Sequence, residues 1–435
     1  MTAEATARWL AHCAEAAETL GAEEHASAAT LREAGREAFA AAGLPTTGQE
    51  EWRYTNPSAL RAVAWEPAAP TTPEVSRDAV EEVASPVFAC GLLVFADGHL
   101  VPGLSTLRAP GVELTPLAEA RRDGELGRLG SLVDTKRHPF AALATAMLDD
   151  GVAIRLPAGT RLEQPIHLVF LSTGAGTPRA AHPRVVVEAG RGSHAVVVQD
   201  HVSLGPGPAF TNAVSELHVG PGAELGFVTL QREGDATFHV SNTAAELERD
   251  ARLHSHVVTL GGRFVRNDLA VRLSGEGAEA TLGGLFLADH ECLVDNHGLV
   301  DHAVPHGTSH QLYKGVLTDR GRGVFRGRVL VRPDAQHTDA RQSNPNLLLS
   351  DGAEIDSKPQ LEIHADDVKC SHGSAIGRVD EDALFYLQAR GIDATEARTL
   401  LVRGFAAEVL RALPEPALSD ALGDTFAERL GGTDS

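Results

Sequence analysis

Turns rich in glycine and aspartate recur at a nearly constant spacing along the middle of the chain. They centre on Gly190, Gly220, Asp250 and Gly277, so that successive turns lie 30, 30 and 27 residues apart. A turn at residues 351–354 closes the series. A fixed period of roughly 20–50 residues is typical of stacked repeats, in which each repeat packs only against its neighbours. The spacing therefore restricts the chain to a small set of repetitive folds.

Short runs of β-branched residues fill the space between these turns, as at residues 184–188, 195–199 and 227–230. They show neither the 3.6-residue period of a helix nor long helical crossovers. We therefore predict a mainly β fold whose core, residues 81–378, is a parallel, right-handed β-helix. A two-sheet sandwich is the alternative, because turns about 8–12 residues apart would fit the same runs locally.

Helical sequence is predicted before this core. Residues 1–80 form an N-terminal helical region, rich in Ala, Glu, Leu and Arg up to about residue 43, followed by a proline-rich linker at 66–73. Trp52 and Tyr54 are interpreted as an aromatic anchor that packs this region onto the core. Within the core, Asp97-Gly98 predicts a hairpin turn, and residues 138–150 predict a short helical insert.

A second helical region, residues 379–435, follows the core. Asp380 and Asp393 are suited to begin two helices, because an aspartate side chain accepts hydrogen bonds from the first free amides. The last helix carries apolar residues at helical spacing, namely Leu418, Leu422, Phe426 and Leu430. An apolar stripe of this kind is usually a core feature, but the surplus of apolar positions in this domain also suggests a docking face for a partner.

The charge of the chain narrows the range of partners. With 59 acidic and 38 basic residues its net charge is -21, which disfavours binding to nucleic acid or to an anionic membrane surface. The most apolar uncharged stretch, residues 83–96, is too short to span a bilayer, and no secretory signal is evident. The four cysteines form no CxxC pair, which favours a reducing, cytoplasmic setting.

Common catalytic motifs are missing from the sequence. It contains no Gly-x4-Gly-Lys-Ser/Thr loop, so the chain is not expected to hydrolyse ATP by itself, and no nucleophile elbow or HExxH motif. Alternating charges at Arg263, Arg266 and Asp268 leave open a carbohydrate-active β-helix enzyme with its site on an exposed sheet.

Cys370 and His372 are the strongest candidate site residues. They lie two apart in a predicted strand and therefore share a face, as soft metal ligands or a thiol paired with a base would. A structural pair at a strand end is the alternative. Other histidines are better explained as exposed or hydrogen-bonded residues, among them His254 and His256. Cys292 is expected to be a buried thiol.

Three histidines, His302, His306 and His310, have the four-residue spacing of a metal-binding helix. Pro305 and Gly307 lie between them and make a helix improbable.

The sequence strings around Cys370 and His372 resemble the SufB/SufD family of the Suf iron–sulfur cluster assembly machinery. The strings that carry the similarity are residues 357–363, 366–373 and 385–392. The similarity is specific from about residue 311 to 405, recognisable at 139–167 and 49–55, and weak in the N-terminal helices. The Val-Lys-Cys-Ser-His-Gly string at 368–373 is similar to SufD-type rather than SufB-type members. His364 departs from the pattern, since an aromatic residue is common there, and it adds an imidazole near the site.

The resemblance implies a non-catalytic scaffold subunit. Such a subunit would pair with a SufB-like subunit across the end of the β-helix and bind a SufC-like ATPase through its C-terminal helices. His372, with Cys370 in support, would contribute to a transient iron–sulfur cluster at that interface. The family also implies a reduced flavin in the whole complex. A SufB-type scaffold that holds a cluster alone is a further alternative.

Overall fold

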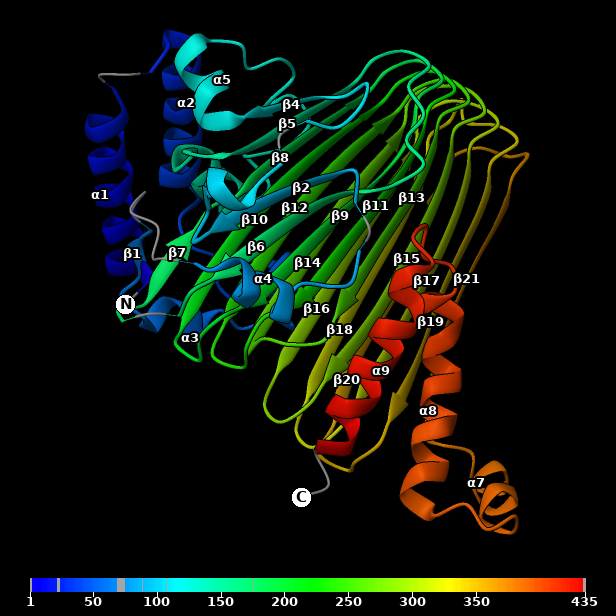
Figure 1. Cartoon of the computed structure of the whole chain (residues 1–435). Coiled ribbons are helices and arrows are strands. Elements are labelled where there is room, and N and C mark those ends of the chain that lie inside the picture. The colour runs from blue at the N-terminus through cyan, green and yellow to red at the C-terminus, as the bar shows by residue number, and fades with distance from the viewer. Residues whose placement is uncertain are drawn as a thin grey trace.

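Consecutive strands alternate between two facing sheets, and the chain thereby coils into a parallel β-solenoid of about 8 turns (Figure 1). The computed structural model describes residues 2–21, 24–68, 75–87, 89–106, 108–174 and 176–432. The predicted mainly β architecture, with a parallel β-helix core and helices at both ends, is confirmed. The two-sheet sandwich is wrong, because neighbouring strands along the solenoid are parallel and belong to successive coils.

Sheet A contains every second strand of the solenoid. From the last coil to the first its main path is β20 (Glu354–Ile363), β18 (Arg322–Val331), β16 (Leu293–His302), β14 (Phe264–Leu273), β12 (Phe238–Leu247), β10 (Ala209–Val219), β8 (Arg184–Ala189), β5 (Gly151–Leu156) and β4 (Glu113–Pro116). Two short strands extend it, β1 (Glu66–Pro67) and β7 (Arg179–Ala181). The predicted linker at 66–73 is therefore a strand at its start, and residues 69–73 lie outside the described ranges.

Sheet B contains the intervening strands and ends in the predicted hairpin. Its order is β21 (Lys369–Gly377), β19 (Asp339–Leu348), β17 (Thr308–Leu317), β15 (Glu279–Ala288), β13 (Arg252–Thr259), β11 (Glu224–Arg232), β9 (His194–Ser203), β6 (Ile166–Ser172), β2 (Gly91–Ala96) and β3 (His99–Leu100). Asp97 and Gly98 both adopt positive φ in the antiparallel β2–β3 turn, as a tight hairpin requires.

In-register stacking of like residues forms the core between the sheets. The parallel ladders align one inward position from coil to coil, so that its side chains form a column. One such column is Ala189, Val219, Leu247, Leu273, His302 and Val331, all buried. The imidazole of His302 is accommodated there because its Nε2 lies 2.9 Å from the Ser309 hydroxyl.

The corners that lead from sheet A to sheet B explain the period seen in the sequence. Gly192, Gly222 and Asp250 each adopt a left-handed backbone conformation, which glycine and aspartate tolerate best. The amide of each donates to a carbonyl of the next coil, for example Gly192 to Pro221 at 3.0 Å and Asp250 to Glu276 at 3.0 Å. The corners therefore stack as a hydrogen-bonded ladder.

One turn in this series was wrongly assigned, and two corners were missed. The turn at 351–354 connects β19 to β20 and belongs to the opposite corner, from sheet B to sheet A. The ladder continues instead at His306 and His337, which adopt the same left-handed conformation without being glycine. Their rings stack with centroids 4.8 Å apart. A search for glycine at the left-handed position misses both corners, although Gly307 lies next to His306.

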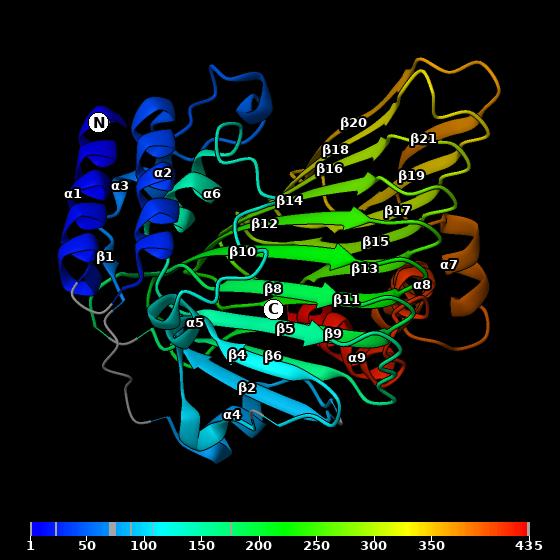
Figure 2. The same ribbon diagram turned by 90° about the horizontal axis from the view of Figure 1, so that it is seen from above.

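Helices near the N-terminus cover the outer face of sheet A (Figure 2). They are α1 (Thr2–Gly21), α2 (Ala26–Ala42), α3 (Ser58–Ala62), α5 (Leu117–Asp123) and α6 (Pro139–Ala146), with the 3-10 turn η1 (Glu50–Trp52). The helix α4 (Arg77–Val83) and the 3-10 turn η2 (Pro102–Leu104) pack instead against strands β2, β6 and β9 of sheet B. Trp9, Phe39 and Phe140 pack with outward Phe210 and Phe238 of sheet A. Trp52 is buried in the same cluster, which confirms the predicted anchor, whereas Tyr54 is half-buried.

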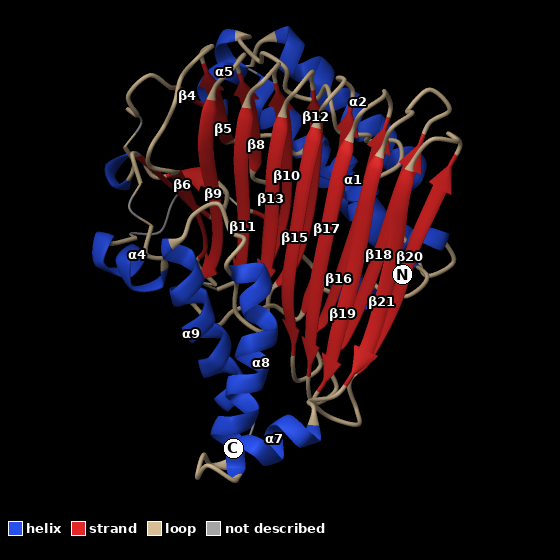
Figure 3. Cartoon of the chain, turned by 90° about the vertical axis from the view of Figure 1, so that its right-hand side faces the viewer, coloured by secondary structure: helices blue, strands red, loops and turns tan. Residues whose placement is uncertain are grey.

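Two of the three C-terminal helices, α8 (Ala394–Leu410) and α9 (Ala417–Gly432), lie against the outer face of sheet B (Figure 3). The first, α7 (Glu381–Gln388), contacts α8 beyond the end of the strands. As predicted, the Asp380 carboxylate accepts from the amides of Asp382 and Ala383, and Asp393 accepts from that of Thr395. Among the described helices, none is long and apolar enough to cross a membrane.

Candidate functional site

Cys370 and His372 lie on β21, the last strand of sheet B, at the open end of the solenoid (Figure 3). Within the described residues, no further coil covers β21 or its counterpart β20 in sheet A. Their outer backbone groups are therefore free to pair with another chain, as at any sheet edge. Two apolar side chains at this end are exposed, Ile363 at 40% and Ile376 at 54%.

Register shows which way the two candidate side chains point. Cys370 is aligned with Ala340 and His372 with Gln342, both buried inward positions of β19. Side chains aligned across a parallel ladder face the same side of the sheet. Cys370 and His372 thus share the inward face, as predicted, and His372 is exposed because no coil follows.

An inward row of amide side chains leads to His372. Gln311, Gln342 and His372 are register partners on β17, β19 and β21. Gln342 Nε2 donates to Gln311 Oε1 at 2.6 Å, which links the two buried amides. The imidazole is therefore the exposed last member of a polar row inside the solenoid.

Cys370 has a more apolar environment than His372. Its side chain is half-buried and packs against a cluster that includes Val329, Val331 and Ala340. Burial raises the pKa of the Cys370 thiol, and the nearby Asp339 carboxylate adds to that increase. The uncharged thiol is therefore favoured in the free chain, which makes the imidazole the more available ligand.

The site offers few ligands from this chain alone. Among the residues that the structure describes, no group of three or more His, Cys, Asp or Glu side chains is arranged to hold a metal ion. His364 is exposed in the corner between β20 and β21. A metal or cluster at the open end would therefore need ligands from elsewhere to complete its coordination.

The apolar stripe of α9 is not a free docking face. Leu418, Leu422 and Phe426 are buried against α8 and the outer face of sheet B. The prediction placed the docking surface on the surplus of apolar residues, and the structure corrects it for this helix. The large apolar side chains of the C-terminal helices that remain exposed are Phe385 (71%), Tyr386 (54%) and Leu400 (45%).

A buried lysine fixes α8 to the solenoid. Lys314 projects outward from β17 beneath the helix, where its Nζ donates to the Phe405 carbonyl at 2.9 Å and lies 2.6 Å from the Glu408 carboxylate. The ammonium also lies 4.4 Å from the centre of the Phe405 ring. These contacts satisfy the buried charge and position α8 next to the open end.

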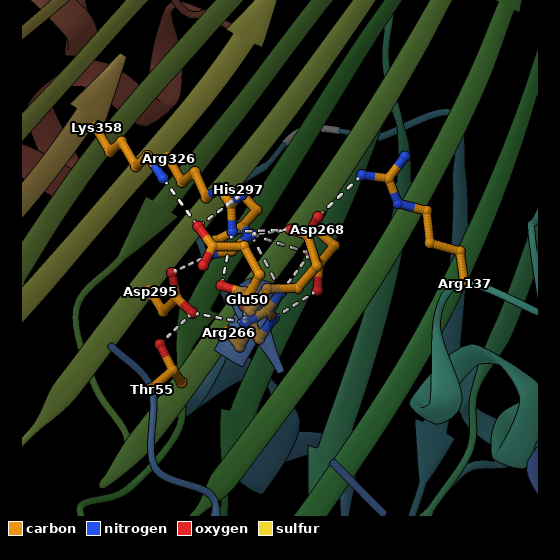
Figure 4. Close-up of polar contacts among 10 residues, drawn as sticks. Glu50, Thr55, Arg137, Arg266, Asp268, Asp295, His297, Arg326 and Lys358 are labelled. Atoms are coloured by element: carbon orange, nitrogen blue, oxygen red, sulfur yellow. Dashed lines mark hydrogen bonds and ion pairs between the residues drawn. The ribbon is translucent and has the colours of Figure 1, made fainter. Parts of the chain in front are cut away.

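An ionic network on the outer face of sheet A was not predicted (Figure 4). Arg266 donates to both carboxylate oxygens of Asp268, at 2.8 and 3.0 Å, and to Asp295 at 2.9 Å. Its guanidinium lies 3.9 Å from the Trp52 ring centre. Although burial alone would raise the pKa of Asp268, the Arg266 guanidinium outweighs it and holds that pKa well below its ordinary value.

The segment at 50–55 crosses this network as a strap (Figure 4). The backbone carbonyls of Glu50 and Glu51 accept from Arg326 and Arg266, at 2.9 and 2.8 Å. The Glu50 carboxylate also accepts from Lys358 on β20 at 2.9 Å. Two of the three charges that suggested a carbohydrate-active site, Arg266 and Asp268, are thus paired with each other beneath this strap. The third, Arg263, is exposed just before β14.

The other candidate residues have structural surroundings. His254 and His256 lie on β13 and share its outward face, and His256 is buried. His302 and His310 lie on strands and His306 in a corner, so no metal-binding helix forms. Cys292 is a buried thiol, as predicted, and burial raises its pKa.

Fold and site together define a parallel β-solenoid protein that presents a thiol and an imidazole at an uncapped end. A family profile described as SUF system FeS cluster assembly, SufBD core domain, matches residues 170–405. That range covers the solenoid from β6 to the middle of α8. The chain belongs to the SufBD family of SUF-system iron–sulfur cluster assembly proteins.

Individual relatives extend the similarity to most of the chain. An iron–sulfur cluster assembly SufBD family protein of Synechocystis sp. is 33% identical over 392 residues, which cover 87% of this chain and 86% of the relative. The iron–sulfur cluster assembly protein SufD of Escherichia coli is 32% identical over 393 residues, 90% of each chain. SufD of Bacillus subtilis is 26% identical over 284 residues, 65% of this chain and 64% of the relative.

Proposed function

We propose that this chain is a SufD-type, non-catalytic scaffold subunit of an ATPase-coupled iron–sulfur cluster assembly complex. It pairs with a SufB-like subunit across the open end of the solenoid, where His372, and secondarily Cys370, take part in building a transient cluster. The observation that carries the proposal is the exposed imidazole of His372, which lies on the inward face of the last strand of the solenoid, in a chain of the SufBD family.

The uncapped end supports pairing with another solenoid. A partner that continued both sheets would cover Ile363 and Ile376 and satisfy the edge strands β20 and β21. It could also supply the ligands that the described residues lack for a metal site. All four cysteines are free thiols, which supports the cytoplasmic location included in this proposal. Flavin binding forms no part of it, because no described residue argues for a flavin site.

Co-expression with a SufB-like subunit and a SufC-like ATPase tests this proposal. We expect the three chains to co-purify as one complex that assembles clusters from iron and sulfide. Ile376→Arg should disrupt the pairing by placing a charge in an apolar contact, whereas Arg378→Ala, at an exposed residue two positions further along, should not. A chain that reconstitutes a stable cluster alone would favour the SufB-type alternative instead.

The isolated chain should hydrolyse no ATP. The sequence has no phosphate-binding loop, so the ATPase activity of the complex must come from another subunit. Phosphate release by the purified chain should remain at the level of a heat-denatured sample. Turnover that persists through several purification steps and follows the amount of this chain would contradict its role as a scaffold.

Docking of the ATPase should depend on the exposed apolar residues of α7 and α8. Replacing Phe385, Tyr386 and Leu400 together by serine should weaken ATPase binding by about tenfold or more, as loss of interface anchors usually does. Arg398→Ser, at an exposed position of α8, is the matched control and should bind normally. Titration by calorimetry measures both affinities.

These substitutions are preferable to removing residues after Ala412. Such a truncation would delete α9 and uncover buried Val228 and Leu230 of sheet B. It would therefore disturb the solenoid as well as any docking surface. Equal ATPase affinity for the triple variant and the control would place the docking surface elsewhere on the chain.

A further inference from the structure

A free hydrogen-bond acceptor lies next to His372 inside the solenoid. Gln342, on β19, is 3% exposed, and its Oε1 has no donor among the described residues. Its Nε2 donates to the Oε1 of Gln311, on the preceding coil, at 2.6 Å. The N–H and C=O groups of an amide point in opposite directions, so the Oε1 of Gln342 faces the following coil. The register partner of Gln342 on that coil is His372.

The facing sheet makes room for this row of amides. Gly327 lies at an inward position of β18, where a Cβ atom would collide with the Nε2 of Gln342. Glycine is therefore required there for the amide to extend across the interior. The free Nε2 of Gln311 marks the inner end of the row, since the register partner of Gln311 is the apolar Leu282. A polar partner follows only at the other end, where the row reaches His372.

The imidazole of His372 can supply the donor that Gln342 lacks. A neutral imidazole has one N–H, and its other nitrogen carries a lone pair that points in a nearly opposite direction. Adjacent strands lie about 4.8 Å apart, so an exposed ring on β21 can reach the amide on β19 by a change of rotamer. Pro359, the register partner of Gly327 on β20, offers no side-chain donor in its place. A buried acceptor without a donor is costly, which favours the bonded rotamer.

We propose that Gln342 is the positioning residue of His372, with its Oε1 accepting the ring N–H. The bond turns the lone pair of the other ring nitrogen toward the open end. That is where a metal ligand is needed in the proposed function, on which this inference rests. Partners of this kind orient a metal-binding imidazole and raise its basicity, so their loss commonly costs about 10- to 100-fold in metal affinity or activity.

Nuclear magnetic resonance on the isolated chain tests the hydrogen bond itself. A hydrogen-bonded ring N–H exchanges slowly with water and gives a proton–nitrogen correlation, which is assigned to His372 by its absence from His372→Ala. Gln342→Met removes the acceptor at nearly constant length and should abolish that signal. Gln342→Glu keeps an oxygen at the same place and should retain it. Gln199→Met is the matched control, because Gln199 is another buried inward amide, 2% exposed, on the distant strand β9.

Cluster formation in the reconstituted complex tests the consequence. Gln342→Met should slow it by about tenfold, the lower end of the range for lost partners of metal-binding imidazoles. Gln342→Glu should restore most of the rate, and Gln199→Met should match the parent chain. The double variant of Gln342→Met with His372→Ala should be no slower than His372→Ala alone, because Gln342 acts only through the ring.

Failure of this inference and failure of the proposed function give different results. An N–H signal that is equal in Gln342→Met and the parent chain, or missing from both, would overturn the inference. A parental cluster rate for Gln342→Met beside a slow His372→Ala would do the same, as would a double variant in which the two losses multiply. A normal rate for His372→Ala, with the N–H signal still dependent on Gln342, would support the hydrogen bond and contradict the proposed function alone.

Discussion

Replacing His372 by alanine is expected to slow cluster formation in the reconstituted complex by roughly tenfold or more, since loss of a metal-site contact commonly has an effect of that size. The side chain is exposed on the last strand, so its removal leaves no cavity and should not impair folding. Visible absorbance of the nascent cluster and activation of an apo-ferredoxin measure the rate. Gel filtration establishes that the variant complex still assembles.

Two further variants make this result specific. His310→Ala removes another exposed imidazole from the same sheet, two strands earlier and on the outward face, and should leave the rate unchanged. Cys370→Ser should have a milder effect than His372→Ala, because the thiol is half-buried and its pKa is raised by burial. An assembled His372→Ala complex that builds clusters at the normal rate would show that His372 and Cys370 have only a structural role.

Acidification from pH 7.5 to pH 5 is expected to lower the thermal midpoint by on the order of 10 °C. Burial lowers the pKa of His182 and His201 to about 3 and that of His256 and His302 to about 4. In the unfolded chain these histidines titrate near their ordinary value, so the unfolded state binds more protons between the two values. The contribution of these histidines to the free energy of unfolding is therefore fully present above about pH 6.5 and is lost as the pH falls below that value.

Each of these histidines should account for about 2 kcal/mol of destabilisation at pH 5. Buried carboxylates do not contribute in this range. Burial alone would raise the pKa of both Glu233 and Asp200. His239 outweighs burial at Glu233 and lowers its pKa to about 2. His167 and Arg232 do the same at Asp200, whose pKa is also about 2. Their protonation begins only at lower pH. Thermal unfolding followed by circular dichroism in the two buffers measures the difference.

His201→Phe tests the cause directly. Neither ring nitrogen of His201 has a hydrogen-bond partner, and its ring stacks on Phe170 with centroids 4.8 Å apart, so phenylalanine preserves the packing. This variant should lose about a quarter of the pH dependence. His310→Phe, at an exposed position, should retain all of it. Identical pH dependence of His201→Phe and the parent chain would show that the buried imidazole is not responsible.

Features that depend on local backbone chemistry could be predicted from the sequence. Glycine and aspartate at Gly192, Gly222 and Asp250 mark corners because those positions need a left-handed conformation. Asp380 and Asp393 mark helix starts because a carboxylate satisfies free amides. Because side chains alternate between the two faces of a strand, the two-residue spacing was sufficient to place Cys370 and His372 on one face.

Features that depend on distant partners could not be predicted. Glu50 and Lys358 are 308 residues apart, and neither carries a local signal of the other. The apolar stripe of α9 was recognised, but a stripe does not reveal whether its cover is the same chain or another. The corners at His306 and His337 were missed because histidine seldom adopts positive φ.

The strap has a consequence for the order in which the chain folds. Each solenoid coil pairs with a neighbour only about 30 residues away, so coils can form one after another with modest loss of chain entropy. The Glu50–Lys358 contact instead requires β20, in the last coil, to be in place. Because contacts of such high sequence separation form late, closure of the Glu50–Lys358 contact marks a chain whose sheet A is complete. During synthesis, the Glu50 end of the segment can therefore close only after Lys358 has emerged.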